Sequence, residues 1–497
     1  MLFNSLSFII FFPIVVVFFF ALPQKYRWML LLAASYFFYL SFEIKYFFLI
    51  ATSTLVSYYT AIWMGNTDDD KLRKKFLLLN LITNLGILFV FKYFNFAIDT
   101  ANFTLEKVQI GYQIPLMRLM LPLGISFYTF QIIGYTLDVY YERVKPQKHL
   151  GIFALYVSFF PQLVAGPIER GGRLLPQFFV KHKFDYNRVK TGLIIMLWGY
   201  FKKLVIADRI SVIVDQVYGT PEQYGGVALI ITTVLFAIQI YCDFSGYTDI
   251  AIGAAKIMGF DLMINFKRPF ISKNISEFWR RWHISLSTWA RDYIYEPIAF
   301  KRKNWGMKGI VWAIFVTFSL LGLWHGAKWA FVFFGVLQGL AFYYEMFTKN
   351  FRAKLARAIP AMIYNKLSIL LTFSFFCFTS IFFRADNIID GFHIAGSLDN
   401  GLLEFISNFT KKLLFEFSLS PGAEVLKELD LQPFDFVILM FAIFTMFQFE
   451  KFGRDGYFWE VLEKAPLIAR WTVYAFIFTF ILMYGEFNIQ EFIYFQF

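Results

Sequence analysis

The sequence predicts an all-α, polytopic integral membrane protein, and both its composition and its long apolar runs support this prediction. Hydrophobic residues make up 58% of the 497 residues and charged residues only 16%, whereas soluble globular chains carry about 25% charged residues. Aromatic residues reach 22%, which requires lipid or a very large core to cover them. A bilayer-spanning helix needs about 20 mostly apolar residues. Runs that approach or reach this length lie at 7–22, 46–64, 119–137, 227–240, 329–347 and 471–486.

Charge and cysteine content narrow the functional classes. The net charge is +12, but the cations cluster in short loops between apolar runs. This pattern indicates the positive-inside bias and contact with anionic membrane lipid rather than with nucleic acid. Cys242 and Cys377 lie in apolar contexts without metal-ligand spacing, so neither a disulfide nor a metal site is expected. The first apolar run lacks a basic segment before it and a cleavage site after it, so we expect a retained helix.

The charges of the loops predict how the helices are oriented in the membrane. Segments 24–27 and 65–75 contain Lys and Arg and are placed on the cytoplasmic side. Helices near 28–41, 46–64 and 76–97 fit this alternation. We expect roughly eleven crossings in one membrane domain, together with re-entrant and interfacial helices.

Two apolar stretches are too short for an ordinary crossing. Basic segments 138–149 and 166–190 flank 150–165, so both can be cytoplasmic only if 150–165 enters the membrane and returns. Pro161 and the Gly-Pro pair that follows permit such a break. The run 310–323 also falls short of a span. Irregular backbone at membrane depth is tolerated only where protein or a water-filled cavity surrounds it, so the sequence predicts a cavity.

Charge also divides the second half of the chain. Segment 267–303 has nine cations against three acids, and we place it in the cytoplasm. Segment 384–435 has nine acids against four cations, and we place it outside. We expect a catalytic core at 120–385, an extracytoplasmic loop region at 386–435 and C-terminal helices at 436–497.

Residues 274–293 are predicted to form one amphipathic helix that Asn274 and Glu277 cap. Two interpretations stay open: an interfacial helix with an incidental histidine, or a helix that lines a cytoplasmic entrance for a phosphate-bearing donor. A helical projection places Phe278, Trp282, Trp289 and Tyr293 on one face, and Arg280, His283, Ser287 and Arg291 on the opposite face.

His325 lies between the apolar runs 310–323 and 329–347, so it is within or near the membrane. Ionisable residues there are costly and usually face a cavity or a partner. A structural hydrogen-bonding role and a catalytic role are both open. A neutral imidazole suits general-base chemistry because its ordinary pKa is about 6.5.

Several motifs together make the chain resemble the membrane-bound O-acyltransferases, and within them the bacterial branch that acetylates exported polysaccharides such as alginate and peptidoglycan. The teichoic acid D-alanyl branch is a more distant resemblance. The motifs are Leu121-Pro-Leu-Gly-Ile-Ser-Phe-Tyr-Thr-Phe-Gln131, Phe159-Phe-Pro-Gln-Leu-Val-Ala-Gly-Pro-Ile-Glu-Arg170, Asp243-Phe-Ser-Gly-Tyr-Thr-Asp249, Phe278-Trp-Arg-Arg-Trp-His283, Gly322-Leu-Trp-His-Gly326 and Phe382-Phe-Arg-Ala385.

The resemblance implies a bowl of helices around a thinned central funnel, in a multi-pass protein of the bacterial inner membrane. It implies acetyl-CoA as the donor substrate, with no further cofactor, and a polysaccharide acceptor. His325 matches the family's catalytic histidine, as general base or as acyl-accepting nucleophile. His283 matches a second family position. The resemblance also implies an extracytoplasmic SGNH-type esterase or transferase as a partner.

The chemistry of acyl transfer assigns further roles. A hydroxyl acceptor must lose a proton and the tetrahedral oxyanion must be stabilised. His325 can take the proton, and His283 or the indole N–H of Trp324 can hold the oxyanion. A covalent acetyl-imidazole on His325 is the alternative. Arg280, Arg291 and Ser287 are predicted to bind the donor.

The C-terminal segment 491–497 adds Tyr494. Tails of this type in the family resemble an aromatic motif in which a Tyr hydroxyl relays the acyl group. The alternative is an interfacial aromatic belt, in which Tyr is enriched.

The other polar residues receive structural interpretations. His149, His182 and His393 are expected to be solvated. Asp243 either orients a histidine or caps a helix. Lys202 and Lys203 are expected to snorkel to the interface.

Two competing functions stay open beside polysaccharide O-acetylation. One is transfer of D-alanine from a carrier protein to teichoic acid. The other is transport of polysaccharide or lipid without chemistry.

Overall fold

The computed structural model describes residues 1–117, 119–416, 418–453, 458–487 and 492–495. These residues form helices and connecting segments, with no strand among them, which confirms the all-α class. The chain divides into two compact units. The first unit contains Met1–Met196 and Thr248–Ile264, and the second contains Leu197–Tyr247 and Asn265–Phe497.

The first unit is built mainly from the N-terminal helices. Its helices are α1 (Leu6–Ala21), α2 (Gln24–Leu40), α3 (Tyr46–Gly65), α4 (Asp70–Leu88), the π-helix η1 (Phe89–Tyr93), α5 (Phe94–Lys107), α6 (Ile125–Tyr140), α7 (Leu150–Ser158), α8 (Phe160–Leu163), α9 (Gly171–Leu174), the 3₁₀ helix η2 (Leu175–Phe179) and most of α10 (Tyr186–Tyr200).

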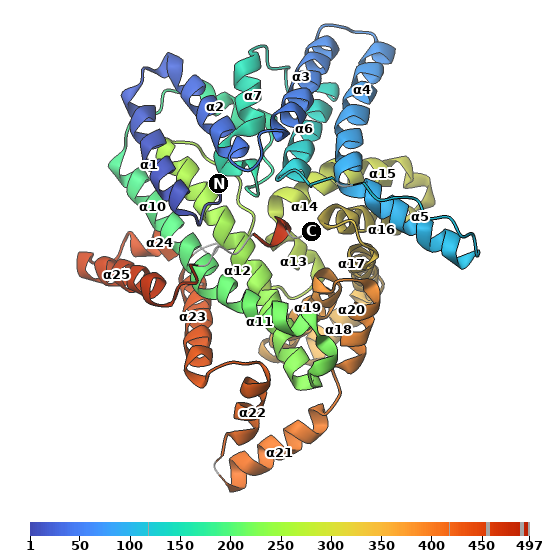
Figure 1. Ribbon diagram of the computed structural model, residues 1–497, viewed down its shortest axis with the longest axis vertical. Coiled ribbons are helices and arrows are strands. Elements are labelled where there is room, and N and C mark those ends of the chain that lie inside the picture. The colour runs from blue at the N-terminus through green and yellow to red at the C-terminus, as the bar shows by residue number, and fades with distance from the viewer. Residues whose placement is uncertain (118, 417, 454–457, 488–491, 496–497) are drawn as a thin grey trace. The chain divides into compact units, whose positions relative to one another are not determined.

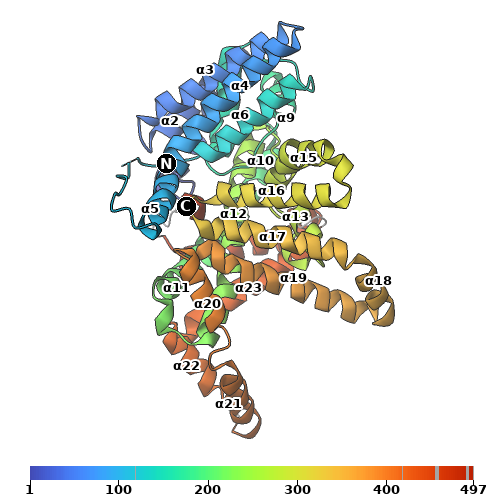
Figure 2. The same cartoon turned by 90° about the vertical axis from the view of Figure 1, so that its right-hand side faces the viewer.

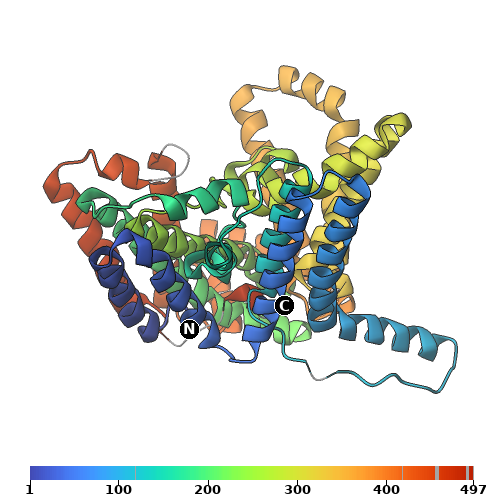
Figure 3. The same cartoon turned by 90° about the horizontal axis from the view of Figure 1, so that it is seen from above.

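Buried amides join the long helices of the first unit. Figures 1 and 2 both show α3, α4 and α6 side by side. Asn80 of α4 donates to the hydroxyls of Ser57 and Thr60 of α3, at 2.9 and 3.1 Å. Such hydrogen bonds replace the apolar driving force that helices lack in lipid. In Figure 3, α5, in light blue, extends away from α4.

The second unit contains the remaining helices. They are η3 (π, Phe201–Ala207), α11 (Asp208–Gly219), η4 (3₁₀, Pro221–Gln223), part of α12 (Gly226–Met258), η5 (3₁₀, Pro269–Ile271), α13 (Ile275–Arg281), α14 (Ile284–Ala290), η6 (π, Arg291–Tyr295), α15 (Glu296–Lys301), η7 (3₁₀, Lys303–Trp305), α16 (Met307–His325), α17 (Trp329–Phe347), α18 (Lys349–Ala358), α19 (Ala361–Arg384), α20 (Ile388–Ser397), α21 (Leu402–Phe415), α22 (Ser420–Glu428), α23 (Pro433–Phe452), α24 (Phe458–Leu462), α25 (Leu467–Tyr484) and η9 (3₁₀, Ile493–Phe495).

Eight helical stretches in the described part of the chain are long and apolar enough to cross a membrane. The prediction that the run 310–323 is too short is wrong, because α16 extends over 19 residues, Met307–His325. The expected eleven crossings and the orientation stay predictions. The eight stretches are Tyr46–Gly65, Asp70–Lys107, Gly226–Met258, Met307–His325, Trp329–Phe347, Ala361–Arg384, Pro433–Phe452 and Leu467–Tyr484.

The predicted break within 150–165 exists. Helices α7 and α8 are separated at Phe159, and both are largely buried. The break precedes Pro161 and lies before the Gly-Pro pair at 166–167. Re-entry into the membrane stays a prediction, since a broken buried helix agrees with it without requiring it.

Residues 386–435 are largely helical rather than a loop, because α20, α21 and α22 occupy most of them. Their apolar positions recur at helical spacing, and the acidic side chains that predicted the loop lie between those positions. Their place outside the membrane, the single membrane domain and the boundaries 120–385 and 436–497 stay predictions.

A close helix pair in the second unit carries His325. α16 and α17 pack against each other along their lengths, as Figure 2 shows. A Cβ at Gly322 would collide with the carbonyl oxygen of Phe331, and one at Gly335 with that of Phe318. These glycines allow the backbones to approach closely, as small residues do between membrane helices. The pair therefore holds the C-terminal end of α16 rigidly.

Candidate active site

The histidine at position 283 interrupts its helix, so the prediction of one helix over 274–293 is wrong. Asn274 caps α13, since its side chain accepts from the Glu277 N–H at 2.8 Å, as predicted. The chain then leaves the helix at Trp282 and adopts a left-handed conformation at His283, with φ 43° and ψ 54°. A second short helix, α14, starts at Ile284. The helical projection that predicts two opposite faces over 274–293 therefore does not apply beyond His283.

Asn265 holds the break in place. Its carbonyl oxygen accepts from the Ile284 N–H at 2.9 Å. Its side-chain oxygen accepts from the Ser285 hydroxyl at 2.6 Å. Asn265 is buried, and the bond from the Ile284 N–H satisfies a backbone group that the broken helix leaves open. The left-handed conformation at His283 is thereby maintained by buried polar contacts.

The apolar face and the polar face that the sequence predicts for residues 274–293 do not exist in the structure. Phe278, Trp282 and Trp289 are buried in protein rather than presented to lipid. The rings of Phe278 and Trp282 stack at 5.4 Å. His283 is fully buried, whereas Arg280 and Arg291 are exposed. The break turns His283 away from the cations that a continuous helix would have placed beside it.

Folding brings the two histidines into one aromatic cluster. His325 is the last residue of α16. The ring of Trp324 lies 5.0 Å from His325 and 6.1 Å from His283, between centroids. His283 is 0% exposed and His325 is 4% exposed. Burial lowers the pKa of His283 well below its ordinary value, and the neighbouring His325 lowers it further. A neutral imidazole is therefore favoured at His283.

Phenylalanines enclose His325. Phe383 lies 5.2 Å from it and Phe334 lies 6.4 Å from it, between ring centroids. Phe244 of α12 contacts His283 edge-on at 4.6 Å. Exclusion of water by these rings strengthens every electrostatic interaction inside the cluster.

Tyr494 completes the cluster. Its ring lies 5.5 Å from His325 and 4.8 Å from Phe244. Burial raises the pKa of the Tyr494 phenol, which stays protonated. Residue 491 and residues 496–497 of the tail lie outside the described residues. Contact with His325 favours the relay interpretation over an interfacial belt.

Asp243 anchors the tail. It lies in the middle of α12, so the prediction that it caps a helix is wrong. Its Oδ2 accepts from the Ile493 N–H at 2.8 Å, and its Oδ1 is 2.8 Å from the Lys203 ammonium. Lys203 also pairs with Asp208 at 2.7 Å. This buried ion group holds the residue next to Tyr494.

The two lysines of η3 do not snorkel, which corrects that prediction. Both are buried, at 3% exposure. Lys202 donates to the Ser245 hydroxyl at 2.9 Å. Burial alone would lower the pKa of Lys203, but Asp243 and Asp208 raise it above its ordinary value. These polar residues of α12 and η3 satisfy one another inside the protein and need no contact with water.

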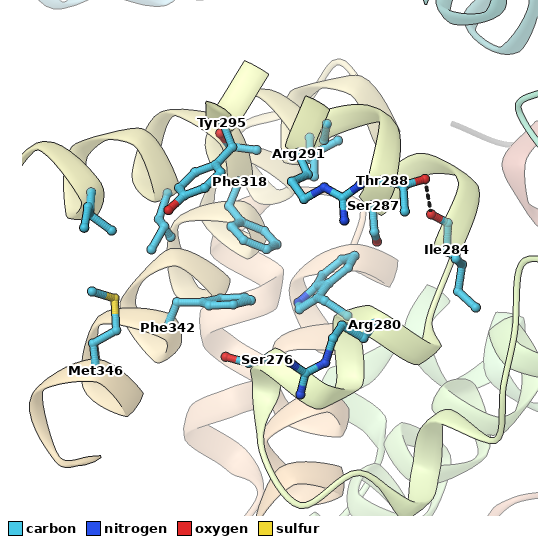
Figure 4. A pocket seen from close by; sticks show the side chains of 16 residues that line it. Ser276, Arg280, Ile284, Ser287, Thr288, Arg291, Tyr295, Phe318, Phe342 and Met346 are labelled. Atoms are coloured by element: carbon cyan, nitrogen blue, oxygen red, sulfur yellow. Dashed lines mark hydrogen bonds between the residues drawn. The ribbon is translucent and has the colours of Figure 1, made fainter. Parts of the chain in front are cut away.

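A cavity of about 510 Å³ opens beside the break. Three predicted site residues, Arg280, Ser287 and Arg291, line it, and so does Ile284, directly after His283. Figure 4 shows the two arginines on different helical segments of its wall. Arg291 also pairs with Asp292 at 2.8 Å. The volume falls within the usual range for ligand sites, about 300–1,000 Å³.

The predicted site residues thus form two groups. Arg280, Ser287 and Arg291 line the cavity, whereas Trp324 and His325 belong to the buried cluster with His283 and Tyr494. Their chemical roles stay predictions.

Sequence reasoning missed two positioning groups. Asn265 and Phe244 contact the His283 break; Asn265 has no sequence signal, whereas Phe244 falls in the motif 243–249, which the resemblance included without a role for it. Phe383 falls in the Phe-Phe-Arg-Ala stretch, which the resemblance included without a role.

The other three histidines, His149, His182 and His393, lie far from His283 and His325 in sequence. His149 and His393 are exposed, as predicted. His182 is only half-exposed, and its Nε2 lies 2.9 Å from the Gln177 carbonyl oxygen. Full solvation of His182 is therefore wrong. In the described part of the chain, no three His, Cys, Asp or Glu side chains gather as metal ligands.

Comparisons with known proteins decide the family. The model of the membrane-bound O-acyltransferase family matches residues 142–384. A probable alginate O-acetylase AlgI of Pseudomonas putida is 36% identical over 408 residues, which cover 82% of this chain and 81% of that protein. The chain belongs to the membrane-bound O-acyltransferase family. It is an O-acyltransferase and a multi-pass membrane protein.

Two further relatives show which other enzymes this chain is similar to. A peptidoglycan O-acetyltransferase of Helicobacter pylori is 33% identical over 385 residues, covering 72% of this chain and 71% of that protein. A teichoic acid D-alanyltransferase of Bacillus subtilis is 30% identical over 271 residues, covering 52% of this chain and 67% of that protein. Both His283 and His325 lie within the matched family region, and Tyr494 lies beyond it.

Proposed function

We propose that this protein is a membrane O-acetyltransferase that passes acetyl groups from cytoplasmic acetyl-CoA across the inner membrane to an exported or cell-wall polysaccharide. The observation that carries the proposal is the buried cluster in which Trp324 contacts both His283 and His325. His283 directly precedes Ile284, which lines the cavity that also contains Arg280 and Arg291. Alginate and peptidoglycan O-acetylating relatives support the acetyl group and the polysaccharide acceptor.

His325 acts as the general base in this proposal. It removes the proton from the acceptor hydroxyl while the oxygen forms a bond to the thioester carbonyl carbon. The tetrahedral intermediate collapses, the C–S bond breaks, and the proton returns from His325 to the thiolate of CoA. The indole N–H of Trp324, or the N–H of His283, stabilises the oxyanion. In the covalent variant, an imidazole nitrogen of His325 attacks the carbonyl first and expels the CoA thiolate, and the acceptor oxygen then attacks the acetyl-imidazole and releases the imidazole.

The cavity is the proposed donor site. Acetyl-CoA carries phosphate groups, and a guanidinium binds phosphate through a planar fork of donors. Arg280 and Arg291 lie at this cavity, with Ser287 on the same wall. The narrow thioester arm must then pass Ile284 to reach His325.

Tyr494 is the proposed relay. Its hydroxyl accepts acetyl from the central site to give an acetyl ester, with His325 taking the phenolic proton. The ester then presents acetyl to an extracytoplasmic SGNH-type transferase, which completes delivery to the sugar. The ring contact of 5.5 Å between Tyr494 and His325 supports this route.

Tyr494→Phe tests the relay. We expect polymer acetylation to fall to background, because the accepting oxygen is gone while the ring contacts are kept. The measurement is acetyl ester content of the polysaccharide in cells that carry the variant, with Tyr343→Phe, an exposed tyrosine of α17, as control. Unchanged acetylation with Tyr494→Phe rules the relay out.

A second candidate is D-alanyl transfer to teichoic acid, which the 30% identical relative supports. An acidic carrier protein could dock on the basic segment 267–303. The acetyl function is favoured because the acetylating relative matches 82% of the chain, against 52% for the D-alanyl relative.

Purified full-length protein in liposomes distinguishes the two. We expect loss of the thioester from labelled acetyl-CoA and no reaction with a D-alanyl carrier thioester. If the protein reacts with the carrier thioester and not with acetyl-CoA, D-alanyl transfer replaces acetyl transfer as the proposed function. Failure to bind or consume either donor would contradict both candidates.

A further inference from the structure

A second cavity of the same unit has no part in the proposed chemistry. Its volume is about 430 Å³, and it lies against the facing ends of α17 and α19. Both helices are candidate membrane spans. The short helix α18 joins them, and Figure 2 shows it at the turn between their adjacent ends.

Charged and tyrosine side chains line one end of this cavity and mainly apolar side chains line its deeper part, where the Thr372 hydroxyl donates to the Ser368 carbonyl oxygen of its own helix. Tyr344 and Glu345 near the end of α17, and Tyr364 near the start of α19, are at the level of the connecting helix. Leu337 and Phe375 lie further into the two spans. Leu337 is eight residues from Glu345, or about 12 Å along a helix. The cavity thus has a polar mouth and an apolar interior about as deep as the upper part of an acyl chain.

Cations dominate the mouth. Lys273 and Arg352 line the cavity, against one acid, Glu345. The Glu345 carboxylate is already engaged, because it accepts from the Ser276 hydroxyl at 2.6 Å and from the Ile275 N–H.

Arg352 is held at this position by two contacts. Its Nη2 donates to the Glu345 carbonyl oxygen at 2.6 Å, and its Nε donates to the Thr348 hydroxyl at 3.2 Å. These contacts use two of the five N–H donors of a guanidinium.

Helix α18 extends the positive charge. Its sequence contains Lys349, Arg352, Lys354 and Arg357 and no acid. Phe351 and Leu355 are four residues apart and exposed, which gives the helix an apolar stripe. A short basic amphipathic helix between two spans is typical of the membrane interface. The positive-inside rule places such a loop on the cytoplasmic side, where anionic lipids gather.

We propose that this cavity binds one anionic phospholipid, with its phosphate at Lys273 and Arg352 and one acyl chain along Leu337, Leu371 and Phe375. The bilayer supplies this ligand directly, since the exposed Leu340 and Leu371 form part of the wall. The bound lipid packs against α13 at its start, Ile275, and so supports the segment that leads to His283. The proposal does not depend on which acyl group the enzyme transfers.

Native mass spectrometry of the full-length protein, titrated with phosphatidylglycerol, tests the site. The double variant Lys273→Gln, Arg352→Gln is compared with Lys349→Gln, Lys354→Gln, which removes two charges that do not line the cavity. We expect the first pair to weaken phosphatidylglycerol binding by about fivefold for each charge, and the control pair to change it by less than about twofold. Phosphatidylcholine should bind more weakly than phosphatidylglycerol.

Two outcomes of this comparison, and one of a second variant, overturn the proposal. Equal weakening by both pairs would show a diffuse charge effect, and equal retention of phosphatidylcholine would remove the anionic requirement. Because Arg352 also bonds within its own turn, Ala341→Trp provides a second variant that keeps every charge and fills the cavity. Undiminished phosphatidylglycerol binding by folded Ala341→Trp would likewise overturn the site.

Discussion

The buried histidine cluster and the arginine-lined cavity lie next to each other along the chain, yet they have opposite physical character. His283 and His325 are 0% and 4% exposed and are surrounded by aromatic rings. The Arg291 side chain is 57% exposed, and Arg280 is exposed as well. Proton transfer from a hydroxyl benefits from a dry environment and a neutral imidazole. Capture of a charged donor requires accessible cations.

A single backbone break produces this difference. Arg280 precedes His283 by less than one helical turn, and a continuous helix would give the two residues a similar environment. The left-handed conformation at His283 turns the imidazole into the protein and leaves Arg280 on the cavity wall. In the proposed mechanism, this break separates donor binding at the cavity from chemistry at the histidine cluster, and the following substitutions test this separation.

His325→Ala should have the largest effect. Loss of a general base lowers kcat by about 10²–10⁴, while the donor still binds because His325 does not line the cavity. Stopped-time assays of acetyl-CoA consumption and equilibrium binding of labelled donor measure the two separately. His393→Ala, at an exposed histidine, is the control. Full activity in folded His325→Ala would remove the base from the mechanism.

Trp324→Phe should have the second-largest effect on kcat. Its ring contacts both histidines, so we expect its indole N–H to stabilise the oxyanion. Loss of one such donor costs about 10²–10³ in kcat, with little change in KM. His283→Ala is measured beside it. A larger loss of kcat in His283→Ala than in Trp324→Phe would assign the oxyanion contact to the histidine instead.

Asp243→Asn should have an intermediate effect. It removes the charge that pairs with Lys203 and weakens the acceptor for the Ile493 N–H. We expect transfer to polymer to fall about tenfold, because small displacements of a reacting group are costly, while consumption of acetyl-CoA with water as acceptor changes less.

Ser245→Ala, which alters the neighbouring Lys202 contact, is the control for Asp243→Asn. A thermal unfolding midpoint for each variant separates loss of folding from loss of positioning. An equal fall in both reactions of Asp243→Asn would show a general structural defect rather than a role in placing the tail.

Arg280→Gln and Arg291→Gln should have the smallest effects. Each removes a partly solvated contact to donor phosphate, and we expect KM for acetyl-CoA to rise about fivefold with kcat unchanged. Initial rates over a range of acetyl-CoA concentrations measure this, with Arg357→Gln on α18 as control. A fall in kcat at unchanged KM would place these arginines in the chemistry and end the separation between cavity and cluster.

The sequence predicted the individual apolar helices well where their ends coincide with changes in polarity. The runs 46–64 and 329–347 became Tyr46–Gly65 and Trp329–Phe347. The run 227–240 was predicted too short, because α12 continues to Met258. Asp243 and Ser245 look like the end of an apolar run, but inside the fold they meet Lys203 and Lys202.

The sequence predicted which residues belong to the candidate site, but not how these residues are arranged in space. Sequence identified His283, His325, Arg280 and Arg291, since ionisable residues among apolar runs are costly and must have a reason to be there. It could not show the break at His283, because Trp282 and His283 are acceptable inside a helix and the contacts that stabilise the break come from Asn265. It could not show that Tyr494 lies beside His325, because those residues are distant in sequence.

The amino-acid sequence by itself determined that this protein is a helical membrane protein, and its motifs gave the resemblance that implied acyl transfer. Apolar length and rare ionisable residues are local properties, and the bilayer makes both of them visible in a single chain. The tertiary structure decided which ionisable groups are dry and which face the cavity. That decision depends on burial and on partners far along the chain, as Asp243 shows by joining η3 to the tail at Ile493.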